Sequence, residues 1–168
     1  SLVVRDSLVN ASTDALLYDG ASMVTINTSI DEFVINDTST LTTKWYFNLR
    51  VSTKFGNPLP DANISIVNNR TYQVLELVTN LSGDIPQQEL IYYFNNSTQR
   101  IFYNYSINAT HYSFIDTNSS IVEVSTNTFL ELLLGNDTNP PQLAMVYPTS
   151  LNVAYRKSNA QLKPNLSY

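Results

Sequence analysis

The chain has 168 residues, of which 43% are hydrophobic and only 14% charged, with a formal net charge of −5. This length allows one domain-sized core, and the acidic balance argues against nucleic acid as a partner. The sequence contains no cysteine, which excludes disulfides and cysteine nucleophiles. Tyr, Phe, Val, Ile and Thr are plentiful, which predicts an all-β fold. No apolar run approaches the roughly 20 residues of a transmembrane helix, so we expect no membrane insertion in this segment.

Residues 1–40 contain short apolar bursts separated by polar turns, each burst being a predicted short strand. The bursts are Leu2–Val4, Leu8–Val9, Leu16–Tyr18, Met23–Ile26 and Phe33–Ile35. Two interpretations remain open. The bursts are the end of a parallel β-solenoid, or they form an N-terminal β arm that pairs with the edge of a neighbouring sandwich. Their irregular spacing does not favour the solenoid strongly.

Residues 41–136 carry a cleaner strand pattern and are predicted to form one domain. In Lys44–Thr53 apolar and polar residues alternate, which is typical of a strand with one buried face. Six further strands are predicted at Asn63–Asn68, Tyr72–Thr79, Glu89–Phe94, Ile101–Asn108, Ile121–Thr126 and Phe129–Leu134. About seven strands at roughly ten-residue spacing predict a β-sandwich.

Three motifs in this domain appear in a characteristic order. They are GNPLPDA at residues 56–62, TNLSGDI at 79–85 and YSINA at 105–109. This order resembles the carboxypeptidase-regulatory-like, or transthyretin-like, β-sandwich of archaeal and bacterial surface proteins, over about residues 44–134. The resemblance implies an Ig-like or transthyretin-like sandwich with a structural or adhesive role and no active site. One departure is Asn80, which stands where the family has Asp and puts the stabilisation of that turn in question.

Residues 137–168 are predicted to be a proline-rich linker followed by one or more unpaired strands. Pro140 and Pro141 end the domain. Leu143–Tyr147 is a predicted strand, and Asn152–Tyr168 contains one more weak strand. Because a single strand cannot bury itself, we expect this tail to pair with another subunit or to continue into another domain.

Asn-X-Ser/Thr sequons are the most unusual feature of the sequence. With 20 Asn and 35 Ser and Thr, chance predicts about 4 sequons, whereas the chain has 13. They begin at Asn10, Asn27, Asn36, Asn63, Asn69, Asn80, Asn95, Asn96, Asn104, Asn108, Asn118, Asn136 and Asn165. Several, such as Asn63, Asn104 and Asn108, fall on the outward positions of predicted strands, where a bulky sugar has room. We therefore expect covalent N-glycans, no other cofactor, and an extracellular or cell-surface location.

The sequence contains few candidate catalytic groups. The one histidine, His111, lies in a polar loop, where we expect a surface or packing role. The adjacent carboxylates of Asp31 and Glu32 point to opposite faces of a strand, so they do not converge on one bond. Asp61 and Asp116 lie in predicted loops, where turn formation explains them better than calcium binding. We expect no enzyme, and no catalytic, cofactor-binding or metal site.

These features together predict a structural subunit or domain of a glycosylated archaeal cell-surface assembly, either an extracellular filament or a surface layer. Its expected partners are copies of itself or neighbouring domains of the same surface protein, joined by strand pairing through residues 1–10 or 143–155. The alternative is an adhesin or carbohydrate-binding module of a large surface protein. Tyr93 and Phe102 favour that alternative, because the alternation of their strands predicts that they point outward. Tyr92, Phe94, Tyr103 and Tyr105 are predicted to lie in the core. An accessory domain of a secreted enzyme is a third reading.

Overall fold

The structure, a computed structural model, describes residues 1–9 and 13–135 and the backbone of residues 152–154 and 163–165. This part of the chain is all-β and contains no helix. The chain divides into two compact units, residues 1–135 and residues 136–168. In the second unit β13 (Asn152–Ala154) and β14 (Lys163–Asn165) pair antiparallel with each other, where the sequence predicted unpaired strands. The predicted linker and the strand at 143–147 lie outside the described residues.

The first unit contains twelve strands among its described residues. They are β1 (Leu2–Arg5), β2 (Ala15–Leu17), β3 (Ser22–Ile26), β4 (Phe33–Ile35), β5 (Thr40–Thr53), β6 (Asn63–Asn68), β7 (Val74–Val78), β8 (Gln88–Asn96), β9 (Arg100–Phe102), β10 (Asn104–Thr110), β11 (Asn118–Glu123) and β12 (Thr128–Leu134). The predicted bounds of β6 are confirmed. The predicted strand at 101–108 is divided into β9 and β10 at Tyr103.

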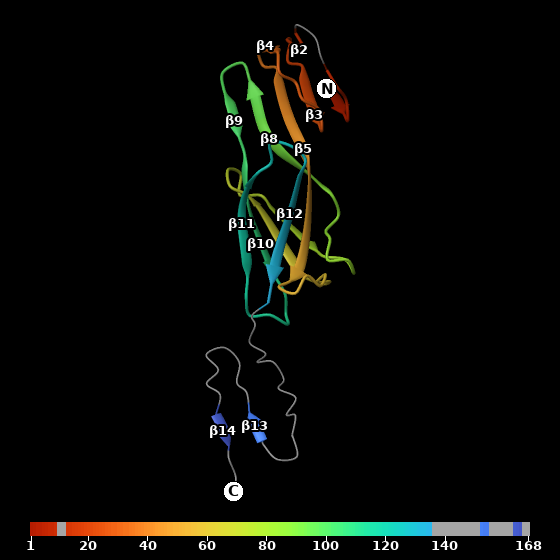
Figure 1. The fold of residues 1–168 in the computed structure, drawn as a ribbon. Coiled ribbons are helices and arrows are strands. Elements are labelled where there is room, and N and C mark those ends of the chain that lie inside the picture. The colour runs from red at the N-terminus through yellow and green to blue at the C-terminus, as the bar shows by residue number, and fades with distance from the viewer. Residues whose placement is uncertain (10–12, 136–151, 155–162, 166–168) are drawn as a thin grey trace. The chain divides into compact units, whose positions relative to one another are not determined.

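Strand β5 is the longest and organises the unit. Its first part, Thr40–Lys44, pairs in parallel with β3, and its last part, Phe47–Thr53, pairs in parallel with β12. Strand β8 pairs antiparallel with residues 40–47 along the opposite edge. The strands β3 and β12 therefore follow one another along the edge of β5 that β8 does not occupy. Figure 1 shows β5 beside β3 and β8 in its first part and beside β12 in its second part.

The region that follows the first part of β5, residues 45–135, is the two-layer body. One layer contains the second part of β5 with β12 and the start of β8. The other is a four-stranded antiparallel sheet in the order β11-β10-β6-β7. Apolar side chains of both layers form one core, in which Phe47, Ile64 and Ile107 are fully buried. The alternating pattern of the sequence places these residues on the inward faces.

The region that precedes the body, residues 1–44 as far as described, winds through successive turns whose strands pair in parallel. We call this β-structured region the N-terminal coil. Here β1 pairs in parallel with β3, and β3 pairs in parallel with β5. A second, two-stranded sheet pairs β2 with β4, also in parallel. A separate small core includes Leu17, Met23 and Leu41. Tyr93 joins this core because the end of β8, which starts in the body, pairs with the coil part of β5. The N-terminal strands are thus stacked on one another rather than extended as an arm.

The side chains of β8 change face where the coil meets the body. The pairing of β5 with β8 shifts register between Thr43 and Lys44, which leaves Tyr92 as an extra residue. As a result Tyr93 is buried in the coil core, while Tyr92 and Phe94 are only partly buried. The prediction that Tyr93 points outward and Tyr92 and Phe94 inward is wrong for this reason. A bulge reverses the parity of every residue that follows it.

Candidate functional site

The sequon asparagines differ in how far the fold exposes them. Ten of the thirteen lie in the described part of the chain with their side chains, and six of these ten are exposed. The exposed six are Asn36, Asn63, Asn69, Asn80, Asn104 and Asn108. Asn10 and Asn136 lie outside the described residues, and only the backbone is described at Asn165. An exposed carboxamide is what attachment of a bulky sugar requires.

Four of the exposed sequon asparagines belong to the outward side of the β11-β10-β6-β7 sheet. Asn104 and Asn108 alternate with the buried Tyr105 and Ile107 along β10, so both point away from the core. Asn63 has the same orientation at the start of β6 and is paired with Thr110 of β10. We call this surface the asparagine-rich face.

Asn69 joins this face from the turn after β6. Its backbone N–H donates to the carbonyl of Asn104 at 2.9 Å, and its side-chain oxygen accepts from the Ser106 hydroxyl at 2.7 Å. The Asn69 oxygen is thereby held in place. An N-linked sugar attaches through the amide nitrogen, so this hydrogen bond leaves the attachment atom available.

Four sequon asparagines are less accessible. Asn95 is buried with 8% of its surface exposed, and its side chain lies on the inward side of the coil region. A sugar on Asn95 would have to displace that packing, which favours Asn96 of the two overlapping sequons. Asn27, Asn96 and Asn118 are partly buried. Asn27 Nδ2 donates to Asp6 at 2.7 Å and its Oδ1 accepts from Asn127 at 2.7 Å, so both of its polar atoms are engaged.

The outward side of β5 and β12 forms the opposite face of the body and carries no sequon asparagine. Its exposed residues include Phe129 and Leu133 of β12, with 59% and 44% of their surface exposed. Arg50 donates to both carboxylate oxygens of Asp84, at 2.8 and 3.1 Å. That guanidinium, through its hydrogen bonds, lowers the pKa of Asp84. We call this surface the sequon-free face.

Asn80 orders the turn at residues 79–85. Its side-chain oxygen accepts from the backbone N–H groups of Ser82 at 2.8 Å and of Asp84 at 3.1 Å, which orders the turn. Gly83 completes the turn at φ 75°, and a Cβ there would lie 2.4 Å from the carbonyl oxygen of Val51. Glycine is therefore required at this position for space as well as for conformation.

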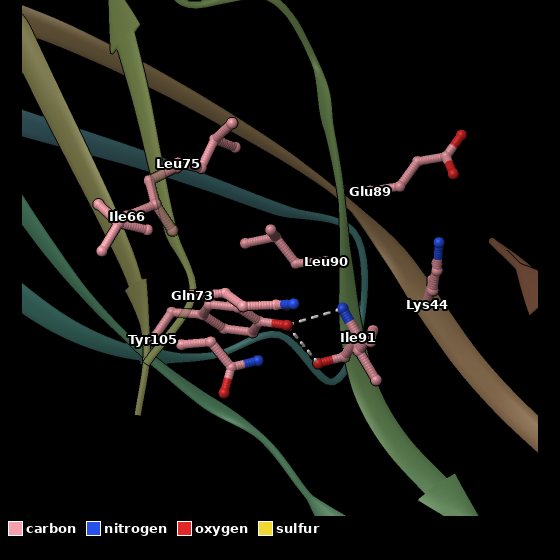
Figure 2. A pocket seen from close by; sticks show the side chains of 10 residues that line it. Lys44, Ile66, Gln73, Leu75, Glu89, Leu90, Ile91 and Tyr105 are labelled. Carbon is pink, nitrogen blue, oxygen red and sulfur yellow. Dashed lines mark hydrogen bonds between the residues drawn. The ribbon is translucent and has the colours of Figure 1, made fainter. Parts of the chain in front are cut away.

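A pocket of about 450 Å³ opens between the two layers of the body. Figure 2 shows apolar residues of both layers around it, among them Leu75 and Leu90, with Lys44 and Glu89 on one side. The Tyr105 hydroxyl accepts from the backbone N–H of Ile91 at 2.9 Å and donates to its carbonyl at 3.1 Å. Burial raises the pKa of Tyr105 to about 12. This tyrosine therefore ties one layer to the other.

The remaining polar candidates are held in local structure. His111 is buried, and its Nδ1 accepts from the Ser113 backbone N–H at 3.1 Å while its ring packs on Tyr112. Asp61 has φ 57°, a turn conformation, and Asp116 forms an ion pair with Lys54 at 3.8 Å. Within the described ranges no group of three or more His, Cys, Asp or Glu side chains could hold a metal ion. The same ranges contain no helix long and apolar enough to cross a bilayer.

The aromatic residues considered for sugar binding do not form an open platform. Tyr93 is buried, and its ring lies edge-on to Tyr92 with centroids 5.3 Å apart. Arg100 covers Tyr93 at 5.0 Å from the ring centroid. Of Tyr93 and Phe102, the two aromatic residues predicted to point outward, only Phe102 is exposed. The aromatic surface left for a sugar ring is Phe102 with part of Tyr92, and these two rings are tilted by 57° rather than coplanar.

Comparisons with family models, with curated proteins and with solved structures found no match to this chain.

Proposed function

We propose that the chain is a structural subunit or domain of a glycosylated archaeal cell-surface assembly, an extracellular filament or a surface layer. The observation that carries the proposal is the unequal distribution of sequons over the body. Asn63, Asn69, Asn104 and Asn108 are exposed on the asparagine-rich face, whereas the strands β5 and β12 of the sequon-free face carry no sequon asparagine. The exposed Asn80 lies beside that face, in the turn that contains Asp84. Glycans on one face and an unglycosylated surface on the other suit a subunit of a cell-surface layer or filament, which contacts solvent on one side and neighbouring subunits on the other.

The composition of the surface supports the same function. A chain with only 14% charged residues needs another source of solvation. Glycans on uncharged asparagines supply hydroxyl groups without adding charge. The exposed Phe129 and Leu133 then lie on the face where no sugar would prevent contact with a copy of the chain or a neighbouring domain.

The proposal includes assembly through strand pairing and an Ig-like or transthyretin-like type of sandwich. The motif order at 56–62, 79–85 and 105–109 supports the sandwich type. Thr79 supports it as well, because its hydroxyl donates to Leu59 O at 2.7 Å and accepts from the Ala62 N–H, joining the first two motifs. Among the described strands, β7 has an unpaired edge with exposed valines at both ends, which suits strand addition.

Glycopeptide mass spectrometry of the protein isolated from its native cells tests the proposal. We expect sugar on Asn63, Asn104 and Asn108, and none on Asn95. A variant with Asn63→Gln, Asn104→Gln and Asn108→Gln should lose the mass of three glycans. The matched control is Asn48→Gln, which changes an asparagine of β5 outside any sequon and should leave the glycan mass unchanged.

Electron microscopy of the same native material tests the assembly. An ordered lattice or fibre, with sugar density on the asparagine-rich face and protein contacts on the sequon-free face, is the expected result. Unmodified asparagines on the asparagine-rich face, or a dispersed monomer in native material, would contradict the proposal.

A further inference from the structure

The N-terminal coil has a repeat of its own. Ala15 of β2 pairs with Phe33 of β4, and Ser22 of β3 pairs with Thr40 of β5, in both cases 18 residues later. Strand β1 precedes its partner β3 by 21 residues, since Leu2 pairs with Met23. Each turn of the coil therefore contributes one strand to each of two parallel sheets.

The corners of successive turns also match. Asp19 and Asp37 follow β2 and β4 with φ 55° and 54°, and Asp6 and Asn27 follow β1 and β3 with φ 50° and 48°. Asp and Asn are the residues other than glycine that most readily adopt this left-handed conformation. The same backbone geometry thus recurs at equivalent positions, as in a stacked repeat structure.

The coil is covered on one side and open on the other. The inward residues Leu41, Met23 and Leu2 occupy equivalent positions on β5, β3 and β1, and their exposed fractions are 0%, 5% and 56%. Among the described strands, none pairs with the outer edge of β1 or of β2. The inward side chains at these positions are therefore buried next to the body and exposed at β1, in the outermost turn of the coil.

The shortness of its strands, four residues in β1 and three in β2, is the main feature that protects this open edge from further pairing. Natural edge strands carry lysine, proline or a bulge that prevents further pairing. Strand β2 is uncharged, and the one charged residue of β1, Arg5, donates to Tyr46 of β5 and Glu89 of β8, away from the open edge. The nearby Leu8 is also exposed. End repeats of stacked structures need a polar outer side to remain soluble, whereas this end exposes the apolar side chains of Leu2, Val3 and Leu16 among its polar residues.

We infer that the open edge of β1 and β2 is a docking site for one more turn of the same coil, a segment with this 18-residue repeat. Its first strand lies parallel to β1, with an apolar residue stacked on Leu2, and its second strand lies parallel to β2. A second copy of the chain fits less well, because two-fold symmetry would place one β1 antiparallel to the other. Every strand pair within the coil is parallel. The inference rests on the coil alone and is independent of glycosylation.

Extending the chain with its own repeat tests the inference. In the test protein a copy of residues 22–39 is placed directly before Ser1. This copy contains the sequence of β3 followed by that of β4, and we expect the first to pair with β1 and the second with β2. The control carries Met23→Ser, Ile30→Ser and Phe33→Ser within the added copy, which removes apolar residues that pack into the coil core. The readout is hydrogen exchange at the backbone N–H groups of β1 and β2.

We expect these groups to exchange at least about tenfold more slowly in the extended chain than in the control. Slow exchange at Phe47 and Ile107 in both proteins verifies that the body is folded. Equal exchange of β1 and β2 in the two proteins would overturn the inference. A dimer of the unextended chain that protects β1 in proportion to protein concentration would also overturn it, since the occupant would then be a second copy.

Discussion

The N-terminal coil and the two-layer body share strand β5 but bury its inward side differently. In the body the inward residues of β5 are Phe47, Leu49 and Val51, all of them apolar and almost fully buried. In the coil they are Leu41 and Thr43, and the Thr43 hydroxyl accepts from Thr25 of β3 at 3.0 Å. The body thus has a continuous apolar core, whereas the coil combines a small core with a buried polar contact between its turns. Stability in the coil then depends on neighbouring turns, and in the body on facing sheets.

The largest expected effect is removal of a body side chain. Phe47→Ala should lower the free energy of unfolding by about 3–5 kcal/mol, because it leaves a cavity between the two layers. Chemical denaturation followed by tryptophan fluorescence measures the loss. The matched control is Phe129→Ala, an exposed phenylalanine of β12, which should change stability by no more than about 0.5 kcal/mol. Equal effects of the two substitutions would show that the body core does not dominate the stability.

A smaller effect is expected from the polar contact of the coil. Thr25→Val alone leaves the buried Thr43 hydroxyl without its donor and should cost about 1–3 kcal/mol. The double variant Thr25→Val, Thr43→Val should be close to neutral, because both buried hydroxyls are replaced by methyl groups of similar shape.

A double-mutant cycle measures this coupling, with hydrogen exchange in β3 as the local readout. If the effects of the two single substitutions simply add in the double variant, the threonine contact does not hold the turns together. The distinction between a polar coil and an apolar body would then be lost.

The smallest expected effect concerns the contact between the layers, for which Tyr105→Phe is the test. The substitution should cost about 1 kcal/mol at neutral pH, because the adjacent pocket admits water to the Ile91 backbone groups. The folded-state pKa of Tyr105 is raised to about 12, above the value of about 10 in an unfolded chain. Folding therefore favours the neutral phenol. Its stabilisation is complete below pH of about 10 and is lost as the pH rises towards about 12.

Urea denaturation between pH 8 and pH 12 measures this dependence. The difference in stability between the native protein and Tyr105→Phe should narrow over the upper two pH units. Tyr112→Phe, a change in an exposed tyrosine, serves as the control and should follow the native protein throughout. A constant difference across the range would mean that the Tyr105 hydroxyl is not buried between the layers.

The sequence predicted the body better than the coil. Alternation of apolar and polar residues located β6 to its exact ends of Asn63 and Asn68, because its inward residues Ile64 and Ile66 are apolar and alternate with polar Asn63 and Ser65. Strand β5 extends four residues further than predicted, to Thr40, because the inward Thr43 disguises the pattern. The bulge in β8 carries no sequence mark of its own, so the orientation of Tyr93 could not be read from parity.

The 18-residue repeat of the coil is hard to predict from the sequence for a related reason. Its most constant signal is not apolar residues but the corner residues Asp19 and Asp37, 18 positions apart. Residues Ser22–Thr25 and Thr40–Thr43 occupy equivalent positions 18 residues apart. Their sequences show this only once the two segments are aligned by their strand pairing. The outward positions of Asn63, Asn104 and Asn108 followed from parity alone. The burial of Asn95 did not, because it lies beyond the bulge.

The unbroken course of β5 has a mechanical consequence. Its residues 40–53 run through both regions, and hydrogen bonds to β3 and β12 on one edge and to β8 on the other lie side by side along it. A pull along the strand loads these bonds in shear, so that many must break at once. A hinge between the regions would instead concentrate the load on a few bonds. One continuous strand therefore lets tension pass from coil to body without a weak joint.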